Sequence, residues 1–134
     1  MRRRLRSERG ASSIELVLYT PVLFFVIFVI VQFALTWHGN QVASAAAREA
    51  ARSARIDGGT PDALAAAEQH GETYAAQIGA GALTDVTVQV VLVGDDEVRA
   101  TVTGRSMEIV DGLAPRVTQS VQGPIEEFRP DLGP

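Results

Sequence analysis

Cysteine is absent from this chain of 134 residues, and lysine is absent too. The lack of cysteine excludes disulfides, thiol catalysis and cysteine-ligated metal sites. Aromatic residues are scarce outside one segment, since six of the eight lie between Tyr19 and Trp37. The chain is about as long as one ordinary domain, so a second sizeable core is not expected. These features predict a membrane-like segment joined to a body rich in alanine and valine.

Charge is unevenly distributed along the chain. The formal net charge is −4, from 12 basic and 16 acidic residues. Residues 1–9 contain five arginines and one acid, which gives +4, so the remainder carries −8. The excess of basic residues is therefore confined to a short N-terminal tag on an acidic body. This distribution excludes a nucleic-acid-binding protein built on a basic body.

The apolar segment from Ile14 to Trp37 is long enough to cross a membrane. As a helix its 24 residues would extend about 36 Å, against a hydrocarbon core of roughly 30 Å. The arginine-rich tag precedes it directly, which predicts a cytoplasmic N-terminus and an exported C-terminal body. Trp37 and Tyr19 suit the aromatic belts at the two interfaces. We therefore expect a single-pass protein whose first partner is the lipid bilayer.

Two secretory alternatives compete with a retained anchor. Ala43-Ser44-Ala45 could serve as a signal-peptidase site, and the twin arginines could direct a separate export route. The apolar run is longer than the core of a signal peptide, and the alanines continue past the candidate site into a helical pattern. The sequence favours the retained anchor.

Glu15 does not fit a plain anchor, because a carboxylate this close to an apolar span is costly to place in lipid. The simplest interpretation is a side chain that reaches water at the headgroup boundary. However, Gly10 ends the basic leader, and Glu15 is the fifth residue after it. This arrangement resembles the processing site of type IV pilin-like precursors. The resemblance implies cleavage between Gly10 and Ala11 by a membrane aspartyl peptidase, the prepilin peptidase.

Cleavage at that bond would free an amine on Ala11, four residues or roughly 6 Å along a helix from Glu15. The amine of a neighbouring subunit could then neutralise the Glu15 carboxylate in the membrane. Assembly would thereby remove an isolated charge from lipid.

A narrower resemblance covers roughly residues 8–55. It is carried by Arg9-Gly10, Ile14-Glu15, Pro21, Gln32-Phe33 and the run AAREAAR at residues 46–52. The segment resembles the N-terminal half of TadE-like proteins of tight-adherence (Flp-type) pilus systems. The resemblance implies a non-enzymatic, pseudopilin-like structural or assembly protein of the cytoplasmic (inner) membrane. Its partners would be other pilin-like subunits and pilus assembly proteins.

The expected organisation has three parts: a basic cytoplasmic leader at 1–10, a transmembrane helix and junction at 11–41, and an exported α+β domain at 42–134. Residues 42–55 have high helix propensity and should continue the membrane helix without a break. A stripe of small residues on this helix would permit close approach of another helix or a sheet; it consists of Ala43, Ala47, Ala50 and Ala54.

A second stripe on the same helix is cationic and comprises Arg48, Arg52 and Arg55. One interpretation is a solvated face that pairs locally with Glu49. The alternative is a contact with another subunit or with lipid headgroups.

A second helix is predicted between two glycine-rich breaks. Thr60-Pro61-Asp62 supplies an N-cap, a first-turn proline and an early acid, and the helix should run to about Ile78. Leu64, Tyr74 and Ile78, with intervening alanines, would form its buried face.

The period then changes to that of strands. Residues 86–93 and 98–103 alternate around the turn 94–97, which predicts a hairpin. Residues 117–128 offer a third strand, which Pro124 would restrict to an edge or a bend. A loop at 107–114 is expected to cover an end of this antiparallel sheet, and 129–134 should be a mobile tail. The predicted fold class is therefore α+β.

Chemistry-bearing motifs are not evident. His38 and His70 have no metal-ligand partners at suitable spacing, so we interpret both as surface residues. Asp95-Asp96-Glu97 lacks the ligand spacing of a calcium loop and fits a solvated turn. We expect no catalytic residue, no cofactor and no bound metal, and an exported hydrolase is disfavoured. The alternative function is an uncleaved, signal-anchored extracytoplasmic binding or scaffold module.

Overall fold

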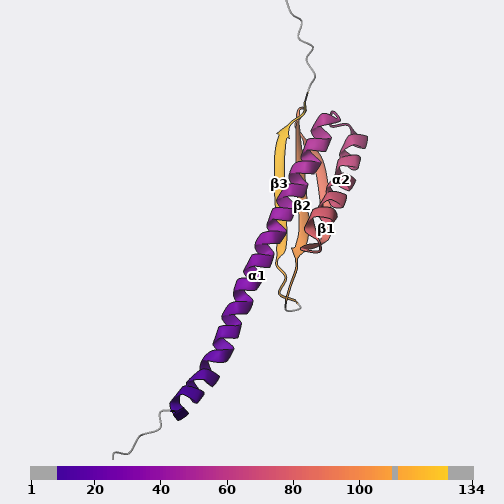
Figure 1. Ribbon diagram of the computed structural model, residues 1–134. Helices are drawn as coiled ribbons and strands as arrows, with labels where there is room; N and C mark the ends of the chain where they lie inside the picture. The colour runs from indigo at the N-terminus through magenta and orange to yellow at the C-terminus, as the bar shows by residue number, and fades with distance from the viewer. Residues whose placement is uncertain (1–8, 110–111, 127–134) are drawn as a thin grey trace, which may run out of the picture. The chain divides into compact units, whose positions relative to one another are not determined.

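The computed structural model describes residues 9–109 and 112–126, with side chains from Ser13 onward. The described elements follow one another as α1 (Arg9–Ile56), α2 (Pro61–Gly79), β1 (Leu83–Val93), β2 (Glu97–Ser106) and β3 (Arg116–Pro124) (Figure 1). The strands form one antiparallel sheet in the order β1-β2-β3. The predicted α+β class, with a long apolar N-terminal helix and a second helix, is confirmed.

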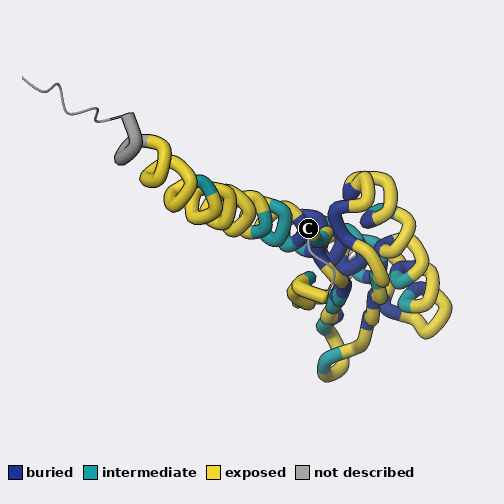
Figure 2. Tube along the Cα trace, turned by 90° about the horizontal axis from the view of Figure 1, so that it is seen from below, coloured by how far each residue is buried: buried dark blue, intermediate teal, exposed yellow. Residues whose placement is uncertain are grey.

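The chain divides into two units, one ending at Phe33 and the other beginning at Ala34. In the first unit, the large apolar side chains of α1 are exposed on all sides, by 41% at Val31 to 74% at Ile14 (Figure 2). Among the described residues, α1 is the one helix that is long and apolar enough to cross a membrane. An apolar surface on all sides of this part of α1 fits a single-pass membrane anchor.

The helix α1 continues without interruption to Ile56, as the sequence predicted. In the second unit its buried side contacts both α2 and the sheet. A Cβ added to Gly39 would lie 3.2 Å from the Cβ of Ser106 on β2, and one added to Gly71 of α2 would lie 3.0 Å from the Cβ of Ala50. Small side chains at these contacts allow the backbones to approach closely. The described core contains alanines and valines with one leucine, Leu83.

The helix α2 begins with the predicted cap, since Thr60 Oγ1 accepts a hydrogen bond from the backbone N–H of Ala63 at 3.3 Å. Its buried face matches the prediction in part, since some of the intervening alanines are buried and Leu64 and Tyr74 pack against the core. Leu64 and Tyr74 are only half-buried and Ile78 is 39% exposed. The buried line consists of small residues at every fourth position: Ala63, Ala67, Gly71, Ala75 and Gly79. The close contact with α1 excludes larger side chains from this line.

The sheet presents mainly valines to the helices and mainly polar residues to the opposite face, where Val91 of β1 is also exposed. Along β2, Val98, Ala100 and Val102 are fully buried, while the alternating residues are exposed or half-buried. β1 begins three residues earlier than predicted, at Leu83. The register shifts between Thr84 and Thr87, and Asp85 has a φ of 50°, so the alternation that identifies a strand is lost there.

The two edges of the sheet differ. Beside β1, the backbone N–H of Val90 donates to Glu68 Oε1 at 2.9 Å, and that of Val88 donates to Glu72 Oε1 at 3.5 Å. Both glutamates lie on α2, one turn apart, so they occupy amides that an added strand would need. No strand among the described residues pairs with the outer edge of β3. Within the part of the chain that the structure describes, the β1 edge is thus partly blocked by α2, and no strand covers the β3 edge.

β3 lies at an edge, as Pro124 predicted, and ends at that proline. The connection from β2 to β3 begins at one end of the sheet, where Met107 N–H donates to the carbonyl of Ala82 at 3.0 Å. Its apolar side chains are largely on the surface, with Ile109 40% and Leu113 64% exposed. The predicted tail 129–134, and the last predicted strand residues 127 and 128, lie outside the described residues.

Candidate functional site

The first candidate site lies at the start of α1. Gly10 and Ala11 both belong to the helix, whose first residue is Arg9. Glu15 is exposed and makes no hydrogen bond or ion pair with the part of the chain that the structure describes. Because Ala11 and Glu15 are four residues apart on a helix, they share one face, roughly 6 Å apart along its axis. The predicted cleavage bond, between Gly10 and Ala11, and Glu15 therefore lie close together at the start of α1.

The stripe of small residues lies farther along α1, in the second unit. Ala43, Ala47, Ala50 and Ala54 each have no exposed surface. Ala50 faces Gly71 of α2 and neighbouring Val42 faces Gly79 of α2. Gly39, Ala46 and Ala51 are buried as well, which the four-residue stripe did not include. This surface is filled by the chain's own helix and sheet, so it is not free to receive another subunit.

The three arginines of the cationic stripe have different surroundings. Arg52 pairs with Glu49, with its Nη2 2.7 Å from Glu49 Oε1. Arg55 instead reaches β3, where its Nε donates to the carbonyl of Pro124 at 2.6 Å, and it also contacts Glu126. Arg48 is exposed and forms no ion pair with another described residue. Of the three arginines, only Arg52 fits the predicted interpretation of a solvated helix face that pairs locally with Glu49.

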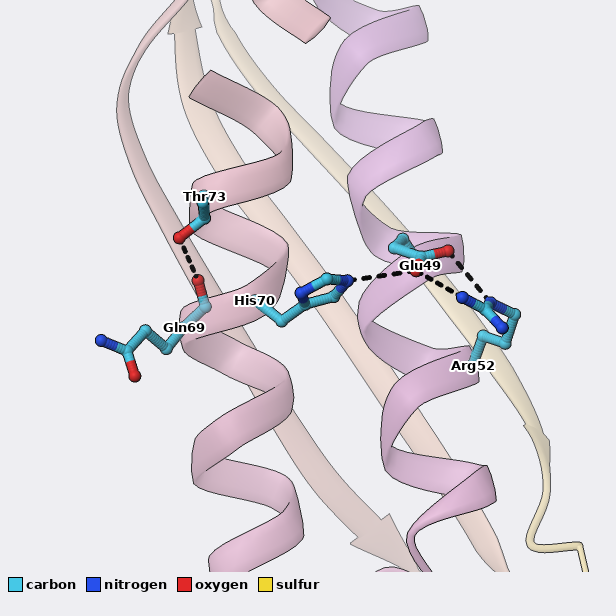
Figure 3. Close-up of polar contacts among 5 residues, drawn as sticks. All are labelled: Glu49, Arg52, Gln69, His70 and Thr73. Carbon is cyan, nitrogen blue, oxygen red and sulfur yellow. Dashed lines mark hydrogen bonds and ion pairs between the residues drawn. The ribbon is translucent and has the colours of Figure 1, made fainter. Parts of the chain in front are cut away.

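Glu49 joins the two helices through a contact that sequence spacing could not reveal. Figure 3 shows His70 of α2 and Arg52 of α1 approaching its carboxylate from opposite sides. His70 Nε2 lies 3.1 Å from Glu49 Oε1, although the two residues are 21 positions apart. The hydrogen bond from Arg52, and then that from His70, lower the pKa of Glu49 from 4.5 to about 2. His70 is a surface residue, as predicted, with a side chain 51% exposed.

The sequence of most of α1 matches the model of a known protein family. Residues 10–52 match the family model for TadE-like protein. The match confirms, over that segment, the resemblance that Gly10, Glu15 and the AAREAAR run indicated. No curated protein and no solved structure matches the chain.

The TadE-like segment takes in both the exposed apolar half of α1 and most of its packed half. It begins at Gly10, includes the Glu49–Arg52 pair and ends before Arg55. The helix α2 and the sheet lie outside it. The sheet end that carries Arg105 and Arg116 is also outside, and no sequence motif pointed to it.

The described residues contain no group of three or more histidine, aspartate or glutamate side chains placed to hold a metal ion. In the acidic turn, Asp95 and Asp96 are exposed, while Glu97 accepts a hydrogen bond from the amide of Gln122. The carbonyl of Asp96 accepts from the N–H of Ile125 at 2.7 Å. This turn therefore contacts the end of β3 through its backbone and through Glu97.

Proposed function

We propose that this chain is a non-enzymatic, pseudopilin-like structural or assembly component of a tight-adherence (Flp-type) pilus or a related secretion apparatus. The observation that carries the proposal is the TadE-like match, which begins at Gly10 and contains Glu15. The exposed apolar surface of α1 up to Phe33 supports it, since this helix has the length and composition of a membrane anchor.

In this proposal the arginine-rich residues 1–10 are a cytoplasmic leader that orients α1 in the cytoplasmic (inner) membrane. Residues 11–41 form the membrane helix and junction, and 42–134 form the exported domain. A prepilin peptidase cuts after Gly10 and leaves the whole apolar helix attached to the mature chain. Other pilin-like subunits and pilus assembly proteins are the partners.

Glu15 is the residue through which subunits recognise one another in the membrane. An isolated carboxylate in lipid is unfavourable, and a cation from a neighbour removes that cost. The new amine on Ala11 of an adjacent subunit supplies the cation. The buried alanines of α1 are already packed within their own chain. Contacts between subunits are therefore made by the exposed apolar side chains of α1.

N-terminal sequencing of protein extracted from the host membrane tests the processing step. The expected product begins at Ala11, and Gly10→Val, which changes the residue before the cut, is expected to retain Met1. Wild-type protein that retains Met1 would falsify the processing step and support an uncleaved anchored scaffold. A chain that begins at Ala46 would instead identify the protein as a secreted module released by signal peptidase.

A further inference from the structure

Glu15 distinguishes one face of α1 in the first unit. The large apolar side chains of this unit are exposed all round the helix (Figure 2), and Glu15 is the one charged residue between Ser13 and Phe33. Charged side chains within membrane helices almost always face the interior of a helix bundle, because lipid cannot solvate them. The face of α1 that carries Glu15 is therefore the face on which a neighbouring helix is expected to pack.

The residues on this face follow a heptad pattern, with alternating steps of four and three residues. We name this line of residues the seam; it consists of Glu15, Tyr19, Val22, Val26, Val29 and Phe33. Steps of this size keep one line of side chains against a partner when two helices cross at a shallow left-handed angle. The seam extends about 27 Å along α1, close to the roughly 30 Å of a hydrocarbon core. It is therefore long enough to guide two helices across most of a membrane.

The centre of the seam is suited to close packing. Val22, Val26 and Val29 are 57%, 46% and 51% exposed, so they are available for contact. A valine in a helix has one strongly preferred rotamer, so packing against it costs little side-chain entropy. Lipid already covers apolar surface, so helices in a membrane associate through such ordered, close contacts. The bulkier Phe24 and Phe28 lie on the opposite face of the helix.

Charge limits how two parallel seams can be aligned. If two copies pack in register, their Glu15 carboxylates lie opposite each other in lipid, where like charges are unfavourable. If one copy is shifted along the helix by half a heptad, about 5 Å, each seam residue lies level with the next seam residue of the partner. Val22 then faces Val26, and Val26 faces Val29. The shifted alignment keeps the seam matched and separates the two carboxylates.

The same shift brings the new N-terminus of one copy level with Glu15 of the other. Ala11 precedes Glu15 by four residues, about 6 Å along the helix, and the half-heptad shift is about 5 Å. The two distances agree to within about 1 Å. The alignment that matches the side chains of the two seams therefore also allows the ion pair that neutralises Glu15 in lipid.

We propose that a second copy of this chain packs on the seam, parallel and shifted by half a heptad, with the Ala11 amine of one copy against Glu15 of the other. The proposal rests on the proposed function, because it needs α1 in a membrane and an amine freed by cleavage. It adds the face of the helix, the direction of the partner and the size of the shift. The residues that carry it all belong to the first unit, so it does not depend on the exported domain.

Disulfide crosslinking of the full chain in host membranes tests this contact. Because the chain has no cysteine, each variant carries one thiol at a known position. Two single-cysteine variants with different tags are produced together, so a crosslink between two copies is identified by its tags. The seam pair is Val22→Cys with Val26→Cys. The matched control on the opposite face, with the same spacing, is Phe24→Cys with Phe28→Cys.

The expected result is several-fold more crosslinked product from the seam pair than from the control pair. Product between Val22→Cys and Val26→Cys should also exceed the self-crosslinking of either variant several-fold, because the shift places these two positions level. Adding Glu15→Val should lower the seam product several-fold, and adding Gly10→Val should do the same because no amine is freed. Leu16→Val, next to Glu15 but off the seam, should leave the product unchanged.

The outcomes separate this proposal from the function on which it rests. Equal or absent products from the two pairs, in membranes where the chain is retained and begins at Ala11, would overturn the seam and keep the proposed function. Self-crosslinking of Val22→Cys that exceeds the mixed product would overturn the half-heptad shift. A chain that keeps Met1, or that leaves the membrane fraction, would overturn the proposed function itself.

Discussion

Glu49 is the residue whose protonation the fold controls most clearly. Its pKa is lowered to about 2, so the folded state favours the carboxylate. The stability that it contributes is fully present above its ordinary pKa of 4.5 and is lost as pH falls toward 2. In Glu49→Gln this contribution is absent at every pH. We expect the gap in thermal midpoint between wild type and variant to be widest above pH 4.5 and to close near pH 2.

Thermal unfolding in mild detergent, followed by circular dichroism across this pH range, provides the measurement. Arg48→Gln is the control, because Arg48 lies beside Glu49 on α1 but forms no ion pair within the described residues. Its melting curve should stay parallel to that of the wild type. A gap between Glu49→Gln and wild type that stays constant down to pH 2 would contradict the assigned role.

At the scale of elements, α2 offers a matched pair of positions that tests the close packing against α1 and the sheet. Ala67 has no exposed surface, whereas the adjacent Ala66 is exposed. Ala67→Leu forces added methyl groups into a filled contact and should lower the free energy of unfolding by about 1–3 kcal/mol. Ala66→Leu should change it by less than about 0.5 kcal/mol. Chemical unfolding in detergent distinguishes them, and equal effects would contradict close packing at Ala67.

Element types were predictable from sequence because each depends on a local pattern. The apolar run, the cap at Thr60 and the alternation after Val86 identified the helices and strands. The buried face of α2 was predicted in part: some of its alanines are buried and Leu64 and Tyr74 pack against the core, whereas Ile78 is exposed. Gly71 and Gly79 were missed, because large apolar residues usually indicate burial, whereas here the short distance to α1 selects alanine and glycine. The start of β1 was missed because the irregular register at Asp85 hides the alternation.

Contacts between elements were beyond what spacing could show. Nothing near His70 in the sequence indicates that Glu49 is its neighbour, because that pairing depends on how α2 packs on α1. The glutamates that bind the β1 amides are also distant from them in sequence, with Glu68 22 positions from Val90 and Glu72 16 positions from Val88. The predicted cleavage site and Glu15 were identified from their order along one helix, and their roles remain predictions.

At the scale of the whole molecule, Glu15 separates membrane insertion from assembly. Glu15→Val makes the span more apolar, so insertion should be unaffected. Assembly should fail, since the variant cannot accept the amine of a neighbouring subunit. Glu15→Asp keeps the charge and serves as the control, with partial rescue expected. Membrane fractionation with crosslinking to partner subunits measures both steps, and wild-type crosslinking by Glu15→Val would contradict the proposed role.

The blocked edge of the sheet limits how copies of this domain can grow into a polymer. Propagation by strand addition needs two available sides on each unit, one for the preceding copy and one for the next. Glu68 and Glu72 occupy the amides of Val90 and Val88 on β1, so within the described residues β3 has the edge without such a block. Strand pairing between copies would therefore stop at two members. A longer array of this protein would then need contacts other than strand pairing.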